Sequence, residues 1–387
     1  TALVDEHIGL IDQEIPRHID RWEGTTSSYG NAIPSVADWY TYARDLKLFA
    51  NERPATLMTD LVNYDMPEIT SLTLATEPSE AGIISIDGFE TSLPVTTGYW
   101  FKERSFNLSA GDKPGYDFSG WYRVSPNWIV KKGDTWKYFD QGNPGTGWNQ
   151  AGFSDDAWKS GPAQLGYGDG DEATVIAMGP IGETRNITNY FRKSITLTAE
   201  MADKGVFVFS LLRDDGAIVY VNGTEVIRNN MSYDYTGDGT GAKETIDYEN
   251  ENIYFTYIID KSYFKEGSNT VAVEVHQKSY TSSDVSFDLG IACYLPGSGS
   301  LVSASPEISY SISDDTYLEA RYNSDGSCMI PSYIESDMTL SVECSPYYAT
   351  GDITIPAGVI LDIDAGVEIR LPQDANIYIS GELNANG

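Results

Sequence analysis

The chain has few of the residues on which metal-dependent and covalent enzymes rely. It contains three histidines and three cysteines among 387 residues. No Cys/His spacing matches a zinc site, and three cysteines are too few for a disulfide-built scaffold. His276 could be combined with Ser282, Ser283 and Asp284 into a Ser–His–Asp arrangement, but no nucleophile-elbow motif accompanies them. We therefore interpret His276 as a structural residue at a strand end and assign no catalytic residues.

Basic residues and long apolar runs are scarce as well. The chain has 25 Lys and Arg against 57 Asp and Glu, a formal net charge of −32. Such a field repels phosphate backbones and anionic lipid surfaces, so nucleic acid is not an expected partner. No stretch reaches the roughly 18 apolar residues of a membrane helix, so no membrane insertion is expected. The acidity suits a calcium-rich exterior, where divalent cations lie between crowded carboxylates, and solubility alone explains it equally well.

The cysteines leave one question open. Cys293 falls on the same strand face as Leu289 and Ile291, which predicts a buried thiol. Cys328 and Cys344 either form one disulfide or both stay free.

The residues that are abundant favour a β protein. The chain has 26 Tyr, 36 Gly and 17 Pro, a composition typical of short strands and turns. The predicted fold is mainly β: an antiparallel jelly-roll β-sandwich as the central domain, a short N-terminal helical segment, a small β-unit and a C-terminal β-helix-like start. The predicted boundaries are 1–65 for the helical segment, 66–125 for the β-unit, 126–296 for the jelly roll and 301–387 for the last part.

Residues 2–64 are the helical part. Apolar residues recur at spacings of three and four, with a kink predicted at Pro16: Ile8, Ile11, Ile15, Ile19 and Trp22. Ser35 and Asp38 form a capping box that opens a second helix, and Arg53-Pro54 is predicted to begin a third. Each helix has one apolar side, so the segment is expected to be stable only when it is docked on a neighbour.

The stretch HIDRWEGTTSSYGNAIPSVADWYTYARDLKLFANERPATLMTDLV resembles the C-terminal end of a spore-coat-protein-H-type (CotH-like) kinase domain. The matching features are His18–Trp22, Trp39, Leu46, Phe49 and Arg53-Pro54. The residues that this family uses for ATP and metal lie upstream of the matched stretch. No P-loop, glycine-rich nucleotide loop or HRD-type loop occurs in the chain, so we do not expect it to transfer phosphate.

Three further stretches resemble known modules. GYWFKERSFNLSAGDKPGYDFSGW looks like an internalin-type B-repeat, whose aromatic residues fill a small core. GYGDGDE, YFR, DDGAIVYVNGTEVIRNNM and VEVHQ…SSDVSFDL follow the order seen in galactose-binding-like jelly rolls. That resemblance implies a module that binds carbohydrate or docks beside another domain and is not itself catalytic. ITIPAGVILDIDAGVEIRLPQDANIYISGELNANG resembles the first rungs of a right-handed parallel β-helix.

Carbohydrate recognition needs flat aromatic faces beside planar polar groups. In the jelly roll the candidates for ligand binding are Trp148, Trp158, Tyr167, Tyr233, Tyr235 and Tyr280. Trp148 and Trp158 could equally be core residues. The long polar and aromatic segment 229–251 favours a functional or mobile loop.

Closely spaced acidic residues in the jelly roll predict at least one calcium site. Calcium takes six to eight oxygen ligands, and loops that alternate Gly with Asp supply them at short spacing. The candidate metal ligands are Asp169, Asp171 and Glu172, then Asp214 and Asp215, and from the closing strand Asp284 and Asp288.

Asp214 and Asp215 have three interpretations. In the first they only form a turn before the hairpin made by Asn222-Gly223. In the second they bind calcium, because two adjacent carboxylates are unfavourable unless a cation or Arg lies beside them. In the third they contact a ligand directly. The pair is similar to the Asp-Asp pair that protective-antigen-type lectin domains use for calcium-dependent sugar binding.

The function predicted is a non-catalytic carbohydrate-binding or adhesion fragment of a secreted or cell-surface bacterial protein. Its expected partners are a carbohydrate or cell-surface glycan and neighbouring domains of the same polypeptide. The chain opens on a helical pattern and closes in mid-pattern, so we expect it to be part of something larger. The alternatives are the accessory C-terminal region of a secreted kinase-like enzyme whose catalytic part lies upstream, and a purely structural spacer.

Overall fold

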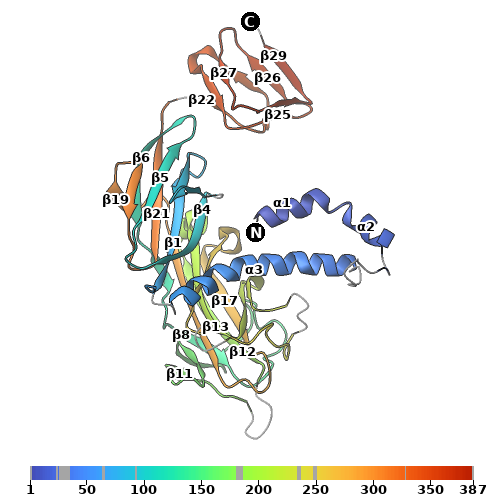
Figure 1. Cartoon of the computed structure of the whole chain (residues 1–387), viewed down its shortest axis with the longest axis vertical. Helices are drawn as coiled ribbons and strands as arrows, with labels where there is room; N and C mark the ends of the chain where they lie inside the picture. Colours follow the sequence, from blue (N-terminus) through green and yellow to red (C-terminus); the bar gives the residue numbers. More distant parts are fainter. Residues whose placement is uncertain are drawn as a thin grey trace. The chain divides into compact units, whose positions relative to one another are not determined.

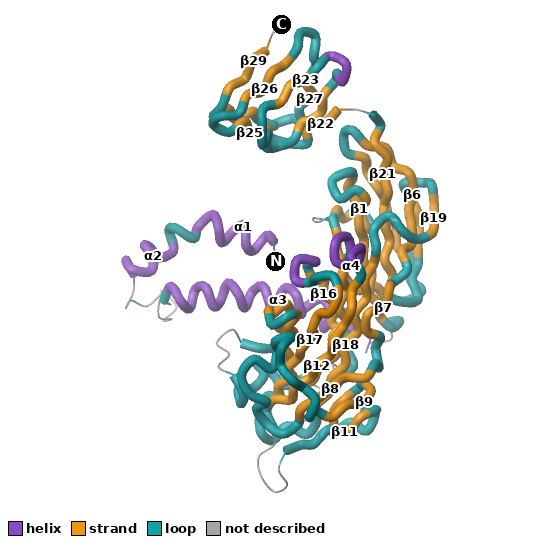
Figure 2. Tube along the Cα trace, turned by 180° about the vertical axis from the view of Figure 1, so that it is seen from behind, coloured by secondary structure: helices purple, strands orange, loops and turns teal. Residues whose placement is uncertain are grey.

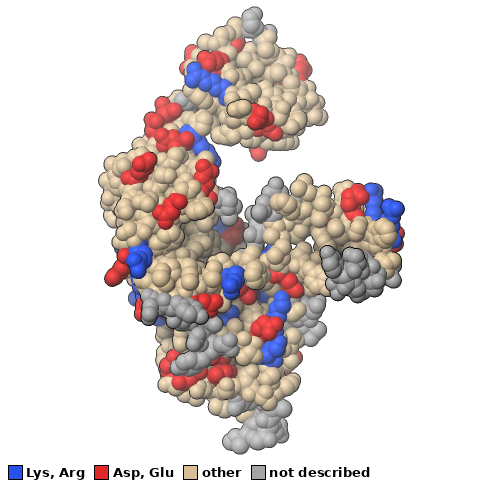
Figure 3. Space-filling model, viewed as in Figure 1, with Lys and Arg blue, Asp and Glu red and all other residues tan. Residues whose placement is uncertain are grey.

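A computed structural model describes residues 2–22, 25, 35–62, 66–91, 94–179, 186–232, 237–246, 251–326 and 328–385. The chain forms two compact units: Thr1–Ile69 with Pro126–Leu295, and Thr70–Ser125 with Pro296–Gly387. Strands dominate both, so the predicted mainly-β fold is confirmed (Figure 1). On the face in Figure 3, acidic and basic side chains are spread over all parts of the chain, with acidic ones in excess.

The first unit begins with three helices: α1 (Ala2–Ile11), α2 (Ile15–Trp22) and α3 (Val36–Val62). The capping box is confirmed, because Ser35 Oγ accepts from the Asp38 N–H at 3.1 Å and Asp38 Oδ2 accepts from the Ser35 N–H at 2.9 Å. The predicted kink and third helix are wrong. Pro16 lies in the first turn of α2, where its missing N–H costs nothing, and α3 runs without a break through Pro54.

The jelly roll of the first unit has two six-stranded sheets. One contains, in spatial order, β11 (Thr174–Val175), β10 (Leu165–Tyr167), β18 (Val285–Tyr294), β13 (Val206–Asp214) and β16 (Phe255–Ile259), with β7 (Asn127–Val130) also paired to β18. The other contains β15 (Thr224–Asn229), β14 (Gly216–Val221), β17 (Gly267–His276), β12 (Thr188–Leu197), β8 (Thr135–Phe139) and β9 (Lys159–Pro162). A short helix, α4 (Ala199–Lys204), precedes β13, and a 3-10 turn, η2 (Lys261–Tyr263), precedes β17.

The core of the jelly roll lies between these two sheets. Phe191 stacks on Phe287 with ring centroids 4.1 Å apart, and apolar residues of both sheets pack around them. Burying each such side chain contributes about 1.5–3 kcal/mol. Cys293 belongs to this core, as predicted, and burial raises the pKa of its thiol to about 11. The Asn222-Gly223 turn is also confirmed, since both residues have positive φ, 51° and 86°.

A loop between β8 and β9 covers the outer face of the second sheet. Arg192, on β12, is buried and holds this loop: its guanidinium donates to the carbonyls of Trp148, Gln150 and Phe153, and its Nε lies 3.0 Å from Asp155 Oδ2. The long loops of the jelly roll are visible in Figure 2 beside β8, β12 and β17.

The second unit contains a smaller sandwich. Its sheets are β19 (Ser300–Ser303), β6 (Tyr116–Val124), β21 (Thr316–Ser324), β1 (Ile69–Glu77) and β4 (Val95–Phe101), and β20 (Glu307–Tyr310), β5 (Phe106–Asp112), β2 (Gly82–Ile86) and β3 (Phe89–Glu90). Trp121 is fully buried in its core, where Phe118 packs against it.

The strand pairing divides the chain differently from the predicted boundaries. The predicted boundaries place residues 301–324 in the C-terminal part, but β19 and β21 both pair with β6, and β21 also runs parallel to β1. The β-unit at 66–125 is therefore completed by strands that follow the jelly roll in the sequence. The paired residues lie between 177 and 244 positions apart in the chain, and no local pattern reveals such a pairing.

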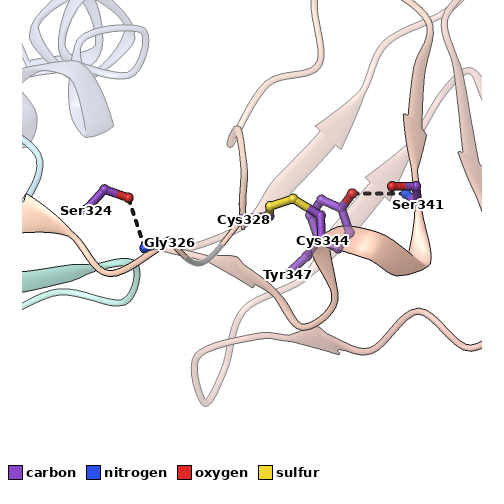
Figure 4. The surroundings of a disulfide bond; sticks show 6 residues. All are labelled: Ser324, Gly326, Cys328, Ser341, Cys344 and Tyr347. Carbon is purple, nitrogen blue, oxygen red and sulfur yellow. Dashed lines mark hydrogen bonds between the residues drawn. A yellow bond between two sulfur atoms is a disulfide. The ribbon is translucent and has the colours of Figure 1, made fainter.

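The last part of the second unit is a parallel coil, the β-helix-like start expected from the sequence. Its three short sheets are β22 (Cys328–Ile330), β24 (Tyr347–Ala349) and β27 (Ile369–Arg370); β23 (Met338–Leu340), β26 (Ile360–Ile363) and β29 (Glu382–Ala385); and β25 (Ile353–Ile355) with β28 (Ile377–Ile379). Cys328 and Cys344 form a disulfide, which links β22 to the 3-10 turn η3 (Val342–Cys344) (Figure 4).

Candidate functional site

Strand register brings distant acidic residues to one end of the jelly roll. The last residue of β13, Asp214, pairs with Ser286 near the start of β18, and Tyr167 at the end of β10 pairs with Val285. The loop after β10 and the residues before β18 therefore meet the end of β13. We call this region the acidic end: residues 168–172, Asp214, Asp215, Glu251 and Asp284.

Asp214 is the most unusual residue of the acidic end. Its side chain is 1% exposed, and neither carboxylate oxygen accepts a hydrogen bond from any residue that the structure describes. Burial, followed by the charges of Asp215, Asp284 and Glu251, raises the pKa of Asp214 to about 9. A buried carboxylate without donors is unfavourable by about 1–3 kcal/mol or more, so this side chain needs a proton or a cation.

Three carboxylates of the acidic end form a compact group that does not include Asp214. Asp169, Glu251 and Asp284 each place one oxygen within 4.8 Å of the others. Two oxygens bound to the same calcium lie at most about 5 Å apart, because each Ca–O bond measures 2.3–2.6 Å. Burial, then the charges of Asp169 and Asp284, raises the pKa of Glu251 to about 7. The spacing suits a cation that several carboxylates share.

The loop after β10 adds a second, overlapping group of Asp169, Asp171 and Glu172. Glu172 closes this loop on itself, since its two oxygens accept from the N–H groups of Asp169 and Gly170, each at 3.0 Å. Ser286 donates to Asp169 Oδ2 at 3.0 Å and so ties the loop to β18. Asp169 belongs to both groups and is the residue that joins them.

Asp215 does not have the free oxygens of its neighbour. Oδ1 accepts from the Ile246 N–H and Oδ2 from the Lys278 N–H, both at 2.7 Å. Asp215 also does not lie in a simple hairpin turn, because β13 belongs to one sheet and β14 to the other. Asp215 therefore connects the two sheets, and its carboxylate holds the loops that contain Ile246 and Lys278.

Asp288 was predicted as a metal ligand, and the structure places it elsewhere. Its Oδ2 accepts from the Gly133 N–H at 2.9 Å and from the Tyr254 hydroxyl at 2.7 Å, and its Oδ1 accepts from the Leu289 N–H. Asp288 pairs with Leu212, two residues further into the sheet than Asp214. Its carboxylate therefore holds the segments that contain Gly133 and Tyr254 against β18.

The sequence analysis did not single out Glu251. It is one of 57 acidic residues and lies in no Gly/Asp-rich motif. It joins the site only because the chain before β16 reaches the acidic end. The signal available in the sequence was the acidic tract DYENEN, and that tract alone does not distinguish a ligand from a solvated loop residue.

The predicted aromatic residues separate into two classes. Trp158 and Tyr167 are buried, Trp158 against Phe139 and Tyr167 in the core, so they offer no surface to a sugar. Trp148 is half-buried and packs edge-on against Tyr190 and Tyr220. Of the candidates that the structure describes, Tyr280 alone is exposed, with half of its side-chain surface accessible. Tyr233 and Tyr235 lie outside the described residues.

His276, the last residue of β17, is fully buried. Its Nδ1 lies 2.8 Å from the Thr240 carbonyl oxygen and 3.1 Å from Thr188 Oγ1, and its Nε2 lies 3.6 Å from Glu274. These contacts fit the structural role predicted for it. No helix among the described residues is both long and apolar enough to cross a membrane.

No family model and no curated protein matches the chain. Among solved structures, a β-glycosidase from Bacteroides vulgatus is 16% identical over 43% of this chain and 20% of its own length, with a TM-score of 0.28. The apo β-glucuronidase from Ruminococcus gnavus is 14% identical over 46% of this chain and 29% of its own, with a TM-score of 0.29. The chain thus spans less than a third of the length of either structure. Likenesses this weak indicate neither a shared activity nor a shared ligand.

Proposed function

We propose that the jelly roll is a calcium-binding, non-catalytic module that attaches a secreted or cell-surface bacterial protein to carbohydrate. The observation that carries the calcium part is the buried side chain of Asp214. Both of its oxygens lack a hydrogen-bond donor among the described residues, and the charges of Asp284 and Glu251 act on it. A divalent cation held by Asp169, Glu251 and Asp284, a group that does not itself include Asp214, would offset these charges.

Calcium fits this set of groups better than zinc does. Asp169, Asp214, Glu251 and Asp284 offer only carboxylate oxygens, which are the ligands of hard cations. Calcium accepts the irregular, partly exposed arrangement of these side chains, since its coordination number and geometry are flexible. Backbone carbonyls and water can supply the remaining ligands, and an exposed coordination position can take a hydroxyl group.

The carbohydrate part of the proposal rests on the surroundings of the cluster. Tyr280 is exposed on the loop that leads to Asp284, so an aromatic face lies on a segment that also supplies a carboxylate. An aromatic face beside polar oxygens is the combination that a pyranose ring needs. The resemblance to galactose-binding-like jelly rolls points to the same class of ligand.

Titration calorimetry of the full chain with calcium chloride tests the metal. We expect binding by the wild type and loss of binding on Asp214→Asn, which removes one anionic ligand and keeps the shape of the side chain. Asp203→Asn is the matched control, because Asp203 lies exposed on α4, before the first residue of β13. At about 3.3 Å per strand residue, this position is roughly 25 Å from Asp214. Equal affinity in all three proteins would contradict the site.

A glycan array tests the ligand. The wild type is expected to bind in calcium and to lose binding in EDTA, with Tyr280→Ala weakening the signal. If the array shows no glycan binding while the chain still binds calcium in the calorimeter, the structural-spacer alternative is favoured. Transfer of labelled phosphate from ATP and magnesium to the chain would contradict a non-catalytic function and favour the kinase-like alternative.

A further inference from the structure

One outer face of the C-terminal coil carries a row of aligned side chains. Thr354, in the middle of β25, is paired with Tyr333 on one side and with Tyr378 of β28 on the other. The Thr354 N–H donates to the Ser332 carbonyl at 2.8 Å, and the Ile334 N–H donates to the Thr354 carbonyl at 3.0 Å. The three paired side chains therefore lie side by side across neighbouring strands. We call them the tyrosine row: Tyr333, Thr354 and Tyr378.

The tyrosine row faces away from the core of the coil. Ile353 and Ile355, on either side of Thr354, are 1% and 0% exposed and belong to that core. Successive residues of a strand point to opposite faces, so Thr354 and its two partners point outward. Tyr333 and Tyr378 are 55% and 54% exposed, and neither hydroxyl makes a hydrogen bond to any residue that the structure describes. Both rings are therefore accessible to a ligand.

Tyr348, on another outer face of the coil, already has a partner within the chain. It lies on β24 and is paired with Arg370 of β27. Arg370 Nη1 donates to the Tyr348 hydroxyl at 2.9 Å, and its Cζ lies 5.5 Å from the centre of the tyrosine ring. Arg370 also donates to Glu368 at 2.7 Å. Because Arg370 is the single basic residue between residues 325 and 387, the coil has no second cation to cover the tyrosine row.

Planar polar groups accompany the tyrosine row. Asp352 and Asn376 precede Thr354 and Tyr378 by two residues, so the alternation places them on the same outer face, roughly 6.6 Å further along the strands. Both are exposed, and Asp352 Oδ1 accepts from the Asn376 N–H at 2.7 Å. Tyrosine by itself is common on exposed strands. Aromatic faces beside an amide and a carboxylate are, in addition, the combination that sugar rings need.

We propose that the tyrosine row is a second carbohydrate-binding surface, which takes a neutral polysaccharide and needs no calcium. The charge of the coil selects the class of glycan: residues 325–387 include ten Asp and Glu against one Arg, so a polysaccharide with carboxylate or sulfate groups is repelled. The proposal does not depend on the acidic end of the jelly roll, because the coil belongs to the other compact unit of the chain.

The spacing of the two tyrosines sets the minimum length of the ligand. Neighbouring strands are about 4.8 Å apart, so two side chains that are two strands apart are separated by roughly 9.6 Å. A sugar ring that contacts one tyrosine at about 3.5–4.0 Å does not reach the other. The tyrosine row therefore binds two or more sugar residues of one chain. With two rings on an open surface the affinity is low, so the washing steps of a glycan array remove such a ligand.

Affinity electrophoresis of the full chain in EDTA tests this surface, because the acidic protein migrates through a native gel that contains dissolved polysaccharide. Hydroxyethyl cellulose, glucomannan and galactomannan are the neutral probes, and polygalacturonate is the anionic one. At least one neutral polymer should retard the wild type, whereas polygalacturonate should not. Tyr333→Ala and Tyr378→Ala should each weaken the affinity about fivefold, and Tyr378→Phe, which keeps the ring, should retain most of it.

Tyr42→Ala is the matched control, because Tyr42 lies on α3, outside the coil, and is 61% exposed. This variant should be retarded like the wild type. A hexasaccharide from the retarding polymer should release the protein, and the corresponding monosaccharide should not.

Two results would overturn the proposal: no retardation of the wild type by any neutral polymer in EDTA, or equal retardation of the wild type and the double variant Tyr333→Ala/Tyr378→Ala. Release by the monosaccharide at the same concentration would contradict a ligand that spans both rings. All these measurements are made without calcium, so they leave the calorimetric test of the jelly-roll site unaffected.

Discussion

Replacing Asp214 with Asn should have opposite consequences in the presence and absence of calcium. Without calcium, the folded wild type keeps a proton on Asp214, because burial and the nearby carboxylates raise its pKa to about 9. The neutral amide of Asn resembles this protonated carboxyl in size and charge. At pH 7 the variant should therefore unfold at nearly the same temperature as the wild type, or slightly higher.

The slight gain in stability expected for Asp214→Asn without calcium follows from the raised pKa of Asp214. The unfolded chain ionises this carboxyl near pH 4, so the folded state must hold a proton that the unfolded state has released. One pKa unit corresponds to about 1.36 kcal/mol, which makes the cost at pH 7 on the order of a few kcal/mol. Asn avoids this cost, and part of the gain is lost again because its N–H groups also need partners.

With calcium, the wild type should unfold at a higher temperature than Asp214→Asn. A ligand that binds only the folded state stabilises it by about 2.7 kcal/mol when its concentration is one hundred times Kd. For a domain of 150–250 residues, each kcal/mol raises the midpoint by roughly 2–4 °C. The wild type should therefore gain roughly 5–10 °C, and Asp214→Asn should gain almost nothing.

Scanning calorimetry in EDTA and in saturating calcium measures both effects, with Asp203→Asn as the control that should follow the wild type in each buffer. A calcium-induced shift in Asp214→Asn equal to that of the wild type would show that Asp214 is not a ligand. A marked loss of stability in EDTA would show that its carboxyl makes a contact that Asn cannot replace, and the reasoning from its orphaned oxygens would fail.

Three other expectations concern pH and packing. Burial raises the pKa of Glu251 to about 7, so between about pH 4.5 and 7 the folded protein holds a proton on this residue that the unfolded chain has lost. The stability of the protein in EDTA should therefore decline as pH rises from about 4.5 to 7. Calcium should flatten that decline in calorimetric scans. Arg192→Met should lower the free energy of unfolding by about 3 kcal/mol in urea titrations, since it removes a buried guanidinium that donates to three loop carbonyls and to Asp155. Arg192→Lys should recover only part of this because it lacks the guanidinium fork. Replacing Cys328 and Cys344 with Ser removes a cross-link over 16 residues, which stabilises the fold by about 3 kcal/mol. The loss should speed tryptic cleavage after Arg370, the single tryptic site between residues 325 and 387. Unchanged cleavage would show that the coil does not depend on the disulfide.

Local features of the molecule could be predicted from the sequence because neighbouring residues determine them. The Ser35–Asp38 capping box and the Asn222-Gly223 turn depend on a few consecutive side chains and on backbone φ, and both are present. The alternation and turn content of residues 126–296 likewise predicted a sandwich, since a strand with one buried face must repeat every two residues. The Gly/Asp-rich segment at 168–172 could be recognised as a source of oxygen ligands for the same reason.

Only the tertiary structure decided which distant groups meet. The pairing of β21 with β1 and β6, and the arrival of Glu251 beside Asp169 and Asp284, join segments separated by long stretches of chain. The same holds for the aromatic candidates: Tyr167 and Tyr280 look alike as residues, and only packing makes one a core residue and the other a surface residue. Sequence specifies which side chains a segment carries, whereas burial and charge at a site depend on the segments packed around it, and a carboxylate such as Asp214 becomes a candidate ligand only when that packing removes its water and its donors.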